Sequence, residues 1–221
     1  MKSLQSYNSS MVRTPRYLVG IDEVGRGPLA GPVAVGAVIV PYDFFSVPNI
    51  FFGVKDSKKL SPLQRRAWFN LLHISRKAGI IDYAVSFVGP RRIEERGING
   101  AIRAALRRSL FRVVRSRAAV PQEIHVLLDG GLLAPENFSQ TTIIKGDETE
   151  PVISLASVAA KELRDRRMIM LAKLFPAYGF ECHKGYATRA HYSALDRSGP
   201  CDLHRAYFLR KFFERKTRHH F

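Results

Sequence analysis

Short apolar runs recur along the chain, separated by polar or glycine-rich segments, and they predict β-strands. The clearest runs are residues 17–21, 33–40, 82–88, 123–128 and 141–145. The first two are continuously apolar, which indicates buried strands, whereas residues 82–88 alternate between apolar and polar side chains. A weaker run at residues 51–54 predicts one further short strand.

The segment after residue 60 has the sequence of a helix start. Ser61 suits the N-cap, Pro62 suits the first helical position, and Gln64 completes a capping box. The helix that begins here is expected to end at Gly79, since glycine commonly follows the last helical residue.

Four more segments are predicted to be helical, at residues 90–117, 151–174, 189–197 and 203–215. In the first, apolar residues recur every four positions and define one buried face: Ile98, Ile102, Leu106 and Leu110. The helix at residues 151–174 is rich in small residues that would let it approach a sheet closely: Ser154, Ala156, Ser157, Ala159 and Ala160.

The order of these elements predicts an α/β fold, in which one mixed β-sheet is flanked by helices and followed by C-terminal helices. With 221 residues, 46% of them hydrophobic, the chain can bury a substantial core. We expect a flexible lead-in at residues 1–16, one domain at 17–204, and a basic, aromatic C-terminal helix or tail at 205–221.

The charge narrows the class of partner. Lys and Arg number 35 against 19 Asp and Glu, a net charge of +16. Such an excess favours a polyanion such as nucleic acid, a ribosome or an anionic membrane surface, although a merely soluble basic surface is the alternative. No apolar run reaches the ~20 residues of a membrane span, and the N-terminus lacks a secretory apolar region. We therefore expect a cytoplasmic, monomeric protein that acts on nucleic acid and not on membranes.

Cysteine usage excludes two further classes. Cys182 and Cys201 are the only cysteines. Two cysteines cannot form a disulfide-rich scaffold or a four-thiolate zinc site.

Carboxylates follow three of the predicted strands. Asp22 and Glu23 end the first, Asp129 follows residues 123–128, and Asp147 follows residues 141–145. Leu127, Leu128 and Ile144 beside them predict that these strand ends are buried. In open α/β sheets such ends form the ligand site, although a carboxylate there can also serve in a turn or helix cap.

Four acids in so basic a protein would repel one another unless cations lay between them. Oxygen-only ligands favour Mg²⁺ or Mn²⁺ over zinc. Two such ions can bind the attacking and leaving oxygens of a phosphoryl displacement. An acidic pocket within a basic surface is typical of a nuclease.

The motifs extend this interpretation. The stretch GIDEVGRGPLAGP at residues 20–32 closely resembles the signature of the bacterial ribonuclease HII family. The resemblance continues in order through DSKKL at 56–60, LDG at 128–130, KGD at 145–147, the helix containing residues 156–166, and HKGY at 183–186. The related ribonuclease HIII family usually has Gly-Lys-Gly in the turn and an additional N-terminal domain, so the Gly25-Arg26-Gly27 turn here favours HII.

The resemblance implies a ribonuclease H-like fold and hydrolysis on the 5′ side of ribonucleotides, in RNA/DNA hybrids and at single ribonucleotides embedded in duplex DNA. Products would carry 3′-hydroxyl and 5′-phosphate ends, a reaction suited to DNA replication and repair. By the same resemblance, the catalytic and metal-binding residues are Asp22, Glu23, Asp129 and Asp147, with two Mg²⁺ or Mn²⁺ ions in the active complex.

Substrate recognition is assigned to the surrounding motifs. Gly25, Arg26 and Gly27 resemble the family's 2′-hydroxyl-reading turn, and glycines leave the backbone open for close approach. Tyr186 matches a tyrosine that packs on the deoxyribose after the ribonucleotide; the alternative is a core tyrosine.

Other residues have weaker assignments. Ser57 and Lys58 precede a helix start, which suits phosphate binding. Asn99 could bond a sugar or phosphate, or be an ordinary surface residue, and His183 and Lys184 could contact phosphate or only shape their loop.

Two further segments have open roles. Arg164 and Asp165 could simply pair with neighbours on their own helix. The tail at 205–221, with six Lys and Arg and five aromatic residues, could grip duplex, pack on the domain or bind a protein partner.

A non-catalytic nucleic-acid or ribosome-binding protein is the competing hypothesis. Net charge does not separate it from a nuclease. The acids at the strand ends do, because a pure binder has no use for them beside phosphate. A P-loop enzyme is excluded because no Gly-x4-Gly-Lys-Ser/Thr motif occurs.

Overall fold

A computed structural model describes residues 14–46, 50–51, 53–54 and 60–218. Its strands are β1 (Tyr17–Val24), β2 (Val33–Pro41), β3 (Asp82–Val88), β4 (Ile124–Asp129) and β5 (Ser139–Ile143). Its helices are α1 (Pro62–Lys77), α2 (Pro90–Ser116), α3 (Gly146–Thr149), α4 (Pro151–Leu174), α5 (Phe180–His183), α6 (Arg189–Ser198) and α7 (Ala206–Arg218). Single 3-10 turns lie at Pro121–Glu123 and Pro176–Tyr178.

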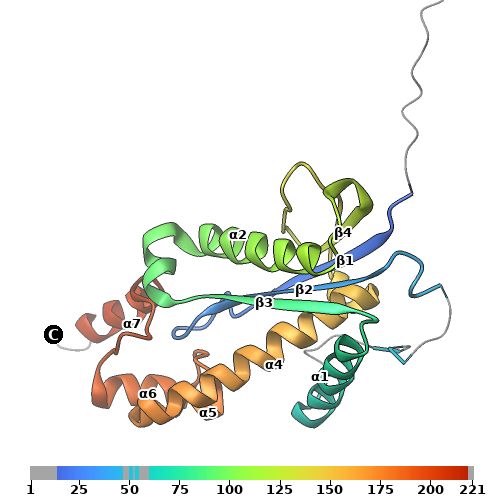
Figure 1. The fold of residues 1–221 in the computed structure, drawn as a ribbon. Coiled ribbons are helices and arrows are strands. Elements are labelled where there is room, and N and C mark those ends of the chain that lie inside the picture. The colour runs from blue at the N-terminus through green and yellow to red at the C-terminus, as the bar shows by residue number, and fades with distance from the viewer. Residues whose placement is uncertain (1–13, 47–49, 52, 55–59, 219–221) are drawn as a thin grey trace, which may run out of the picture.

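The five strands form one mixed sheet in the order β3-β2-β1-β4-β5. The pairs β1–β2 and β2–β3 are antiparallel, whereas β1–β4 and β4–β5 are parallel. Helix α2 covers one face, and α4 with α1 covers the other (Figure 1). The predicted mixed sheet with flanking helices is confirmed.

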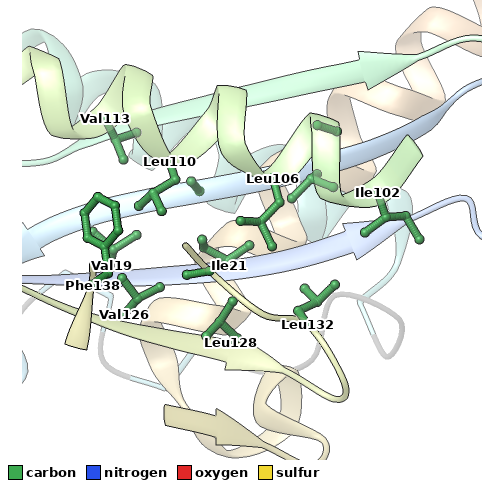
Figure 2. Packing of buried hydrophobic residues seen from close by; sticks show 14 of the residues in the cluster. Val19, Ile21, Ile102, Leu106, Leu110, Val113, Val126, Leu128, Leu132 and Phe138 are labelled. Carbon is green, nitrogen blue, oxygen red and sulfur yellow. The ribbon is translucent and has the colours of Figure 1, made fainter. Parts of the chain in front are cut away.

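The core between α2 and the sheet follows the four-residue spacing seen in the sequence. Ile102, Leu106 and Leu110 are at most 2% exposed and point toward β1 and β4, where Ile21 and Leu128 are fully buried (Figure 2). A helix with this spacing places all its large apolar groups on one side, so the opposite side is left to charged residues.

Helix α4 lies unusually close to the sheet, as its small residues predict. A Cβ added to Gly20 on β1 would stand 2.3 Å from the carbonyl oxygen of Val152. A Cβ added to Gly36 on β2 would stand 2.4 Å from that of Ala156. Glycines on the strands and small residues on the helix thus bring α4 into direct contact with the strand that carries Asp22.

A smaller C-terminal cluster closes one end of the sheet (Figure 1). Leu29 from the glycine-rich turn packs there with Met168 of α4, Phe180 of α5, Leu195 of α6 and Leu209 of α7. The turn after β1 is therefore enclosed by residues from the last third of the chain.

Several element predictions are wrong in detail. Phe51, Gly53 and Val54 are not in a strand; Phe51 instead turns inward and stacks on Trp68, with ring centroids 6.4 Å apart. Helix α2 is broken at Gly97, whose φ of 69° is not helical. The last helix begins at Ala206 and not at residue 203.

The strand predicted at residues 141–145 is shifted. Strand β5 ends at Ile143, and Ile144 is 84% exposed, contrary to the buried position expected for it. Lys145 adopts a left-handed conformation with φ of 56°, which turns the chain out of the sheet and into α3.

Within the part of the chain that the structure describes, no helix is long and apolar enough to cross a membrane.

Candidate active site

The two parallel central strands bring the first carboxylates together. Ile21 on β1 lies in register with Leu128 on β4, so the residues that follow them, Asp22 and Asp129, are neighbours at the same edge of the sheet. Glu23 is the next residue on β1. The expected gathering of acids at strand ends therefore arises from the register of β1 and β4.

Asp147 reaches the same place from a one-turn helix. Its backbone amide lies 3.4 Å from Oδ1 of Asp129, within hydrogen-bond range. The hydroxyl of Ser154, in the first turn of α4, donates to the Asp147 carbonyl at 2.7 Å and ties α3 to α4. Asp147 lies on α3, four residues beyond the end of β5, so the prediction that it ends a strand is wrong in detail.

Asp22 is buried at 2% exposure, as is Asp147. Asp22 lies on β1. Its Oδ1 accepts a hydrogen bond from the Glu23 amide at 2.7 Å, while Oδ2 is buried and makes no hydrogen bond to the described part of the chain. Burial raises the pKa of Asp22 to about 8; the Ser157 hydroxyl opposes this shift, and the charges of Glu23, Asp129 and Asp147 add to it.

Glu23 is paired with Arg26. The Nε of Arg26 donates to Oε1 of Glu23 at 3.0 Å, and its Nη1 donates to Oδ1 of Asn99 at 3.0 Å. Burial raises the pKa of Glu23, and the Arg26 charge opposes that shift. Arg26 therefore links the acids on β1 to α2.

The acid cluster suits a hard divalent cation in its chemistry. All four side chains offer oxygen only, and Oδ2 of Asp22 is a buried acceptor without a donor. No three Asp, Glu, His or Cys side chains among the described residues are already arranged around one point, however.

A cleft opens beside these acids, between α2 and the segment after β4. Its lining includes Glu23, Arg26, Asn99, Arg103, Gly131 and Leu133. Sequence analysis left two alternatives for Asn99, a contact with sugar or phosphate or an ordinary surface position. The structure places Asn99 in this cleft, where it accepts a hydrogen bond from Arg26 of the glycine turn.

The Gly25-Arg26-Gly27 turn is held from behind by Arg205. This side chain is fully buried and donates to the carbonyl oxygens of Gly25 at 2.7 Å, Arg26 at 2.9 Å and Gly31 at 2.9 and 3.0 Å. Burial lowers its pKa to about 9. Sequence analysis missed this role, because Arg205 looks like the first charge of a basic tail and its partners lie about 180 residues earlier.

A second buried arginine supports the same turn. Arg164 donates from Nε to the Pro32 carbonyl at 2.9 Å and from Nη2 to the Lys184 carbonyl at 3.1 Å. A Cβ on Gly25, whose φ is 84°, would stand 2.2 Å from Arg164 Nε, so only glycine fits this position. The suggestion that Arg164 pairs within its own helix is wrong.

Tyr186 lies beside Arg164 and is 38% exposed. The Arg164 Cζ and Lys161 Nζ lie 5.5 and 5.6 Å from its ring centroid. The ring is thus at the surface, against two cations, and not in the core.

Beneath Tyr186 runs a chain of hydrogen-bonded imidazoles. Nδ1 of His191 lies 2.9 Å from the Tyr186 carbonyl oxygen, and its Nε2 lies 3.1 Å from Nε2 of His204. The Cys201 amide donates to Nδ1 of His204 at 2.9 Å. These buried groups fix the backbone at Tyr186.

His183 and Lys184 are engaged with their own loop. His183 bonds the Tyr178 carbonyl oxygen through Nε2 at 2.8 Å and accepts from the Gly185 amide at Nδ1. Lys184 has a left-handed backbone, and its ammonium donates to the Glu181 carbonyl. Contact of either residue with substrate stays a prediction. Ser57 and Lys58 lie outside the described residues.

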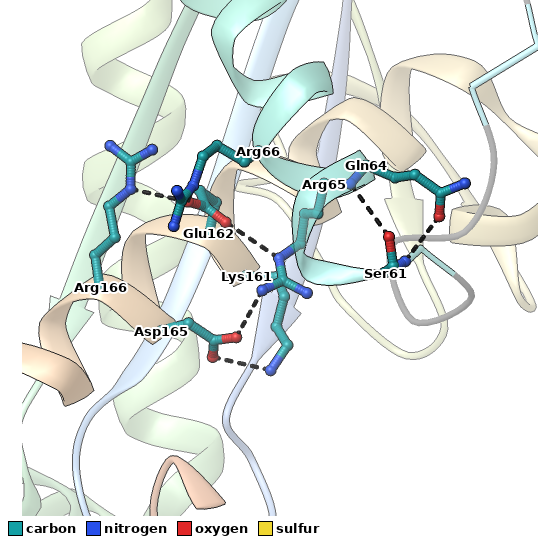
Figure 3. A network of polar contacts seen from close by, with 8 residues as sticks. All are labelled: Ser61, Gln64, Arg65, Arg66, Lys161, Glu162, Asp165 and Arg166. Atoms are coloured by element: carbon teal, nitrogen blue, oxygen red, sulfur yellow. Dashed lines mark hydrogen bonds and ion pairs between the residues drawn. The ribbon is translucent and has the colours of Figure 1, made fainter. Parts of the chain in front are cut away.

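Ion pairs join α4 to α1 next to this loop (Figure 3). Arg65 of α1 donates to Asp165 at 3.0 Å and to Glu162 at 3.3 Å, and Lys161 pairs with Asp165 at 2.9 Å. The predicted capping box is also present, with Ser61 and Gln64 bonded to each other's backbone amides. Asp165 therefore has its expected partner on its own helix and another on α1.

A mixed sheet with carboxylates at the ends of its central parallel strands, within a strongly basic chain, defines a nuclease of the ribonuclease H-like class. The family model described as Ribonuclease HII matches residues 19–216, and the chain belongs to the ribonuclease HII family. Ribonuclease H endonuclease activity follows from this membership. The family predicted from the motifs is confirmed.

Curated relatives agree over most of the chain. The Ribonuclease HII of Chlamydia trachomatis serovar A is 41% identical over 191 residues, covering 86% of this chain and 81% of the relative. That of Bacillus cereus strain Q1 is 43% identical over 192 residues, covering 87% and 68%.

Solved structures share the fold. Ribonuclease H2 from Pyrococcus horikoshii OT3 aligns with a TM-score of 0.66 at 25% identity, covering 90% of this chain and 98% of that one. Bst-RNase HIII in complex with Mn²⁺ also gives a TM-score of 0.66, at 17% identity, covering 98% and 76%. The second similarity concerns the fold alone.

Proposed function

We propose that this protein is a divalent-metal-dependent endonuclease that hydrolyses the phosphodiester 5′ of ribonucleotides. Its substrates are RNA/DNA hybrids and duplex DNA with single embedded ribonucleotides, and its products carry 3′-hydroxyl and 5′-phosphate ends. One observation carries the proposal: Asp22 buries an unpaired carboxylate oxygen among three other acids at the ends of the parallel strands.

The four acids are assigned as the metal-binding and catalytic residues. Asp22, Glu23, Asp129 and Asp147 would hold two Mg²⁺ or Mn²⁺ ions, with Glu23 released from Arg26 to join the other three. The ions would supply Lewis-acid chemistry, activating the attacking water and neutralising charge on the scissile phosphate. The raised pKa of Asp22 supports this role, because a cation is what would keep that carboxyl ionised at neutral pH.

The glycine turn is assigned to reading the 2′-hydroxyl. Arg205 occupies the carbonyl oxygens of Gly25 and Arg26 from inside, which holds the turn in one conformation. At Gly27 a Cβ position has no atom within 4 Å, so the backbone there is open to a sugar. Asn99, bonded to Arg26, would contact a sugar or phosphate from α2.

Tyr186 is assigned to the deoxyribose on the 3′ side of the ribonucleotide. Its exposure and its position beside Lys161 and Arg164 support a contact with the nucleic-acid backbone. Ser57, Lys58, His183 and Lys184 would bind flanking phosphates. We further propose that the protein acts as a cytoplasmic monomer in ribonucleotide excision.

A cleavage assay tests these assignments together. A labelled duplex with one embedded ribonucleotide is incubated with Mg²⁺, with Mn²⁺ or with chelator, beside an RNA/DNA hybrid and an all-DNA duplex. We expect cuts only with a divalent ion and only 5′ of ribonucleotides. Cleavage in chelator, cleavage of the all-DNA duplex, or products with 3′-phosphate ends would contradict the proposal.

A further inference from the structure

The outward face of α2 carries an uninterrupted block of positive charge. Between Glu95 and Glu123 the sequence contains seven arginines and no acidic residue. An ordinary solvated helix face mixes both signs, because i,i+4 pairs of opposite charge stabilise the helix and like charges destabilise it. The run of arginines therefore destabilises α2, and its presence needs an explanation other than helix stability.

Six of these arginines are exposed, and the five that follow Asn99 form what we name the arginine track: Arg103, Arg107, Arg108, Arg112 and Arg115. Arg107 and Arg115 flank Phe111 in one row along the helix, and Arg108 and Arg112 form a second row beside it, one turn apart. A shallow hollow on this surface is lined by Arg107, Arg108, Arg112, Arg115 and Phe111, which is 42% exposed. The Phe111 ring is anchored against Phe138, with centroids 5.8 Å apart.

The track has no anionic partner within the protein as far as the structure describes it. None of its five arginines makes an ion pair with a described carboxylate. Arg108 donates to the Phe87 carbonyl at 2.8 Å. Burial lowers the pKa of Arg108, and the neighbouring charges of Arg92, Arg112 and Arg96 lower it further. A polyanion laid on this face would relieve that repulsion.

The track is continuous with the candidate active site. Arg103, its first member, lines the same cleft as Glu23, Arg26 and Asn99. From Arg103 to Arg115 the helix rises about 18 Å at 1.5 Å per residue. At 3.4 Å per base pair that length corresponds to roughly five base pairs of duplex. Helix α2 leads from the glycine turn toward the opposite end of the sheet (Figure 1).

We propose that the arginine track binds the backbone of the duplex arm that extends away from the cleavage site. This rests on the proposed function, and it adds that affinity and KM depend on the length of that arm. The guanidinium rows would straddle phosphates, since arginine matches phosphate oxygens with two parallel donors. Such contacts do not depend on the base sequence of the arm.

The test compares one triple variant with a matched control. Arg107→Gln/Arg112→Gln/Arg115→Gln removes three charges from the track and spares Arg108, which bonds the protein itself. Lys77→Gln/Lys173→Gln/Arg197→Gln removes three exposed charges from α1, α4 and α6. Both variants are used only if they melt no lower than wild type; relief of charge repulsion on α2 should raise the melting temperature of the track variant.

Each protein is measured on two duplexes with a central ribonucleotide, one with arms of roughly four base pairs and one with arms of roughly fifteen, spanning the reach of the track. Affinity is measured in chelator across a salt series, and KM and kcat are measured with divalent ion. We expect the track variant to lose more affinity, and to raise KM more, on the long duplex than on the short one. Its log–log salt slope there should be shallower by about 2–3, at about 0.9 per phosphate contact.

Three outcomes would overturn the proposal: equal losses on both duplexes, an unchanged salt slope, or equal losses in the control variant. If the track binds another macromolecule instead, such as ribosomal RNA or a protein, the variant will match wild type on both duplexes, which also overturns it. Failure of the proposed function looks different, because the wild-type protein would then not cut either duplex at the ribonucleotide.

Discussion

Two neighbouring regions of this protein treat buried charge in opposite ways. Three carboxylates near the ends of β1 and β4 lie close to Asp147 of α3, and one oxygen of Asp22 is buried without a donor among the described residues. Behind the glycine turn, which begins three residues after Asp22, buried Arg205 has its Nε, Nη1 and Nη2 all bonded to backbone carbonyls. The first region is electrostatically unsatisfied and the second is satisfied.

The difference matches what each region is asked to do. A bound cation would relieve the repulsion among the acids. The free energy that this repulsion costs without the ion would therefore add to the affinity for the ion. In the proposed function the glycine turn distinguishes a 2′-hydroxyl from a hydrogen, which requires a fixed backbone before substrate arrives. A buried cation with only neutral partners lowers the free energy of unfolding. Here that cation is Arg205, and it holds the glycine turn in one conformation.

The largest expected effect comes from removing charge at the acids. Asp22→Asn should lower cleavage by several orders of magnitude while duplex binding survives, because the acid and not the basic surface performs the chemistry. Asp129→Asn should behave alike. Cleavage rates and duplex affinity are measured beside Asp43→Asn, an exposed control. Near-wild-type rates in either variant would remove it from the metal-ligand assignment.

The next effect concerns the support of the turn. Arg205→Met keeps the stem but leaves buried carbonyls without donors, at about 1–3 kcal/mol each. We expect a lower free energy of unfolding and a fall of roughly 100-fold in kcat/KM at a single ribonucleotide, as misplaced groups produce. Arg205→Lys should recover more stability than cleavage, since an ammonium cannot reach three carbonyls at once.

The control for that experiment is Arg210→Met, an exposed arginine on α7, which begins directly after Arg205. Cleavage of a matched all-DNA duplex is followed in parallel to detect lost discrimination. If Arg205→Met unfolds more easily but cuts at the wild-type rate, Arg205 is structural only and not a positioning residue.

Tyr186 should give a smaller, substrate-dependent effect. Tyr186→Ala is expected to weaken cleavage at a single embedded ribonucleotide by roughly tenfold, about 1.4 kcal/mol, and clearly less on a continuous RNA strand. Tyr186→Phe should be mild on both, since the ring face makes the contact. Equal losses on both substrates with a lowered melting temperature would instead make Tyr186 a packing residue.

The smallest effect is a pH dependence of stability without metal. The pKa of Asp22 is about 8 in the folded protein and 3.8 as an ordinary carboxyl. Between these values the native state holds a proton that the unfolded state has lost, so the free energy of unfolding falls as pH rises from about 4 to 8. The Asp22→Asn variant has no carboxyl at this position, so its free energy of unfolding lacks this dependence on pH. The variant should therefore become more stable than wild type as pH rises.

The difference in melting temperature between wild type and Asp22→Asn is measured in chelator at pH 5, 6.5 and 8. Adding Mn²⁺ at pH 8 should stabilise wild type and reduce this difference. Parallel pH curves for the two proteins would mean that Asp22 is not the buried acid described above.

Local patterns predicted much of this molecule. Residues 82–88 and 151–174 match β3 and α4, because their periodicity and caps are local properties. The grouping of Asp22 and Asp129 was also predictable, since both follow apolar runs. What failed depended on distant contacts: Phe51 leaves a strand-like run to pack on Trp68. The position of Arg205 depends on carbonyls near residues 25–31, which no local pattern can indicate.

The imidazoles beneath Tyr186 have a direction. The Tyr186 carbonyl can only accept, so Nδ1 of His191 must carry the proton and its Nε2 must accept from Nε2 of His204. Nδ1 of His204 is then the acceptor for the Cys201 amide. Each ring is thereby committed to one neutral tautomer, and an added proton would set two N–H groups facing each other. Burial already lowers the pKa of His191 to about 4. The two histidines that support the backbone of Tyr186 thus form hydrogen bonds that all point in one direction. Although histidine is the residue type most prone to titrate near neutral pH, this pair keeps its protonation state there.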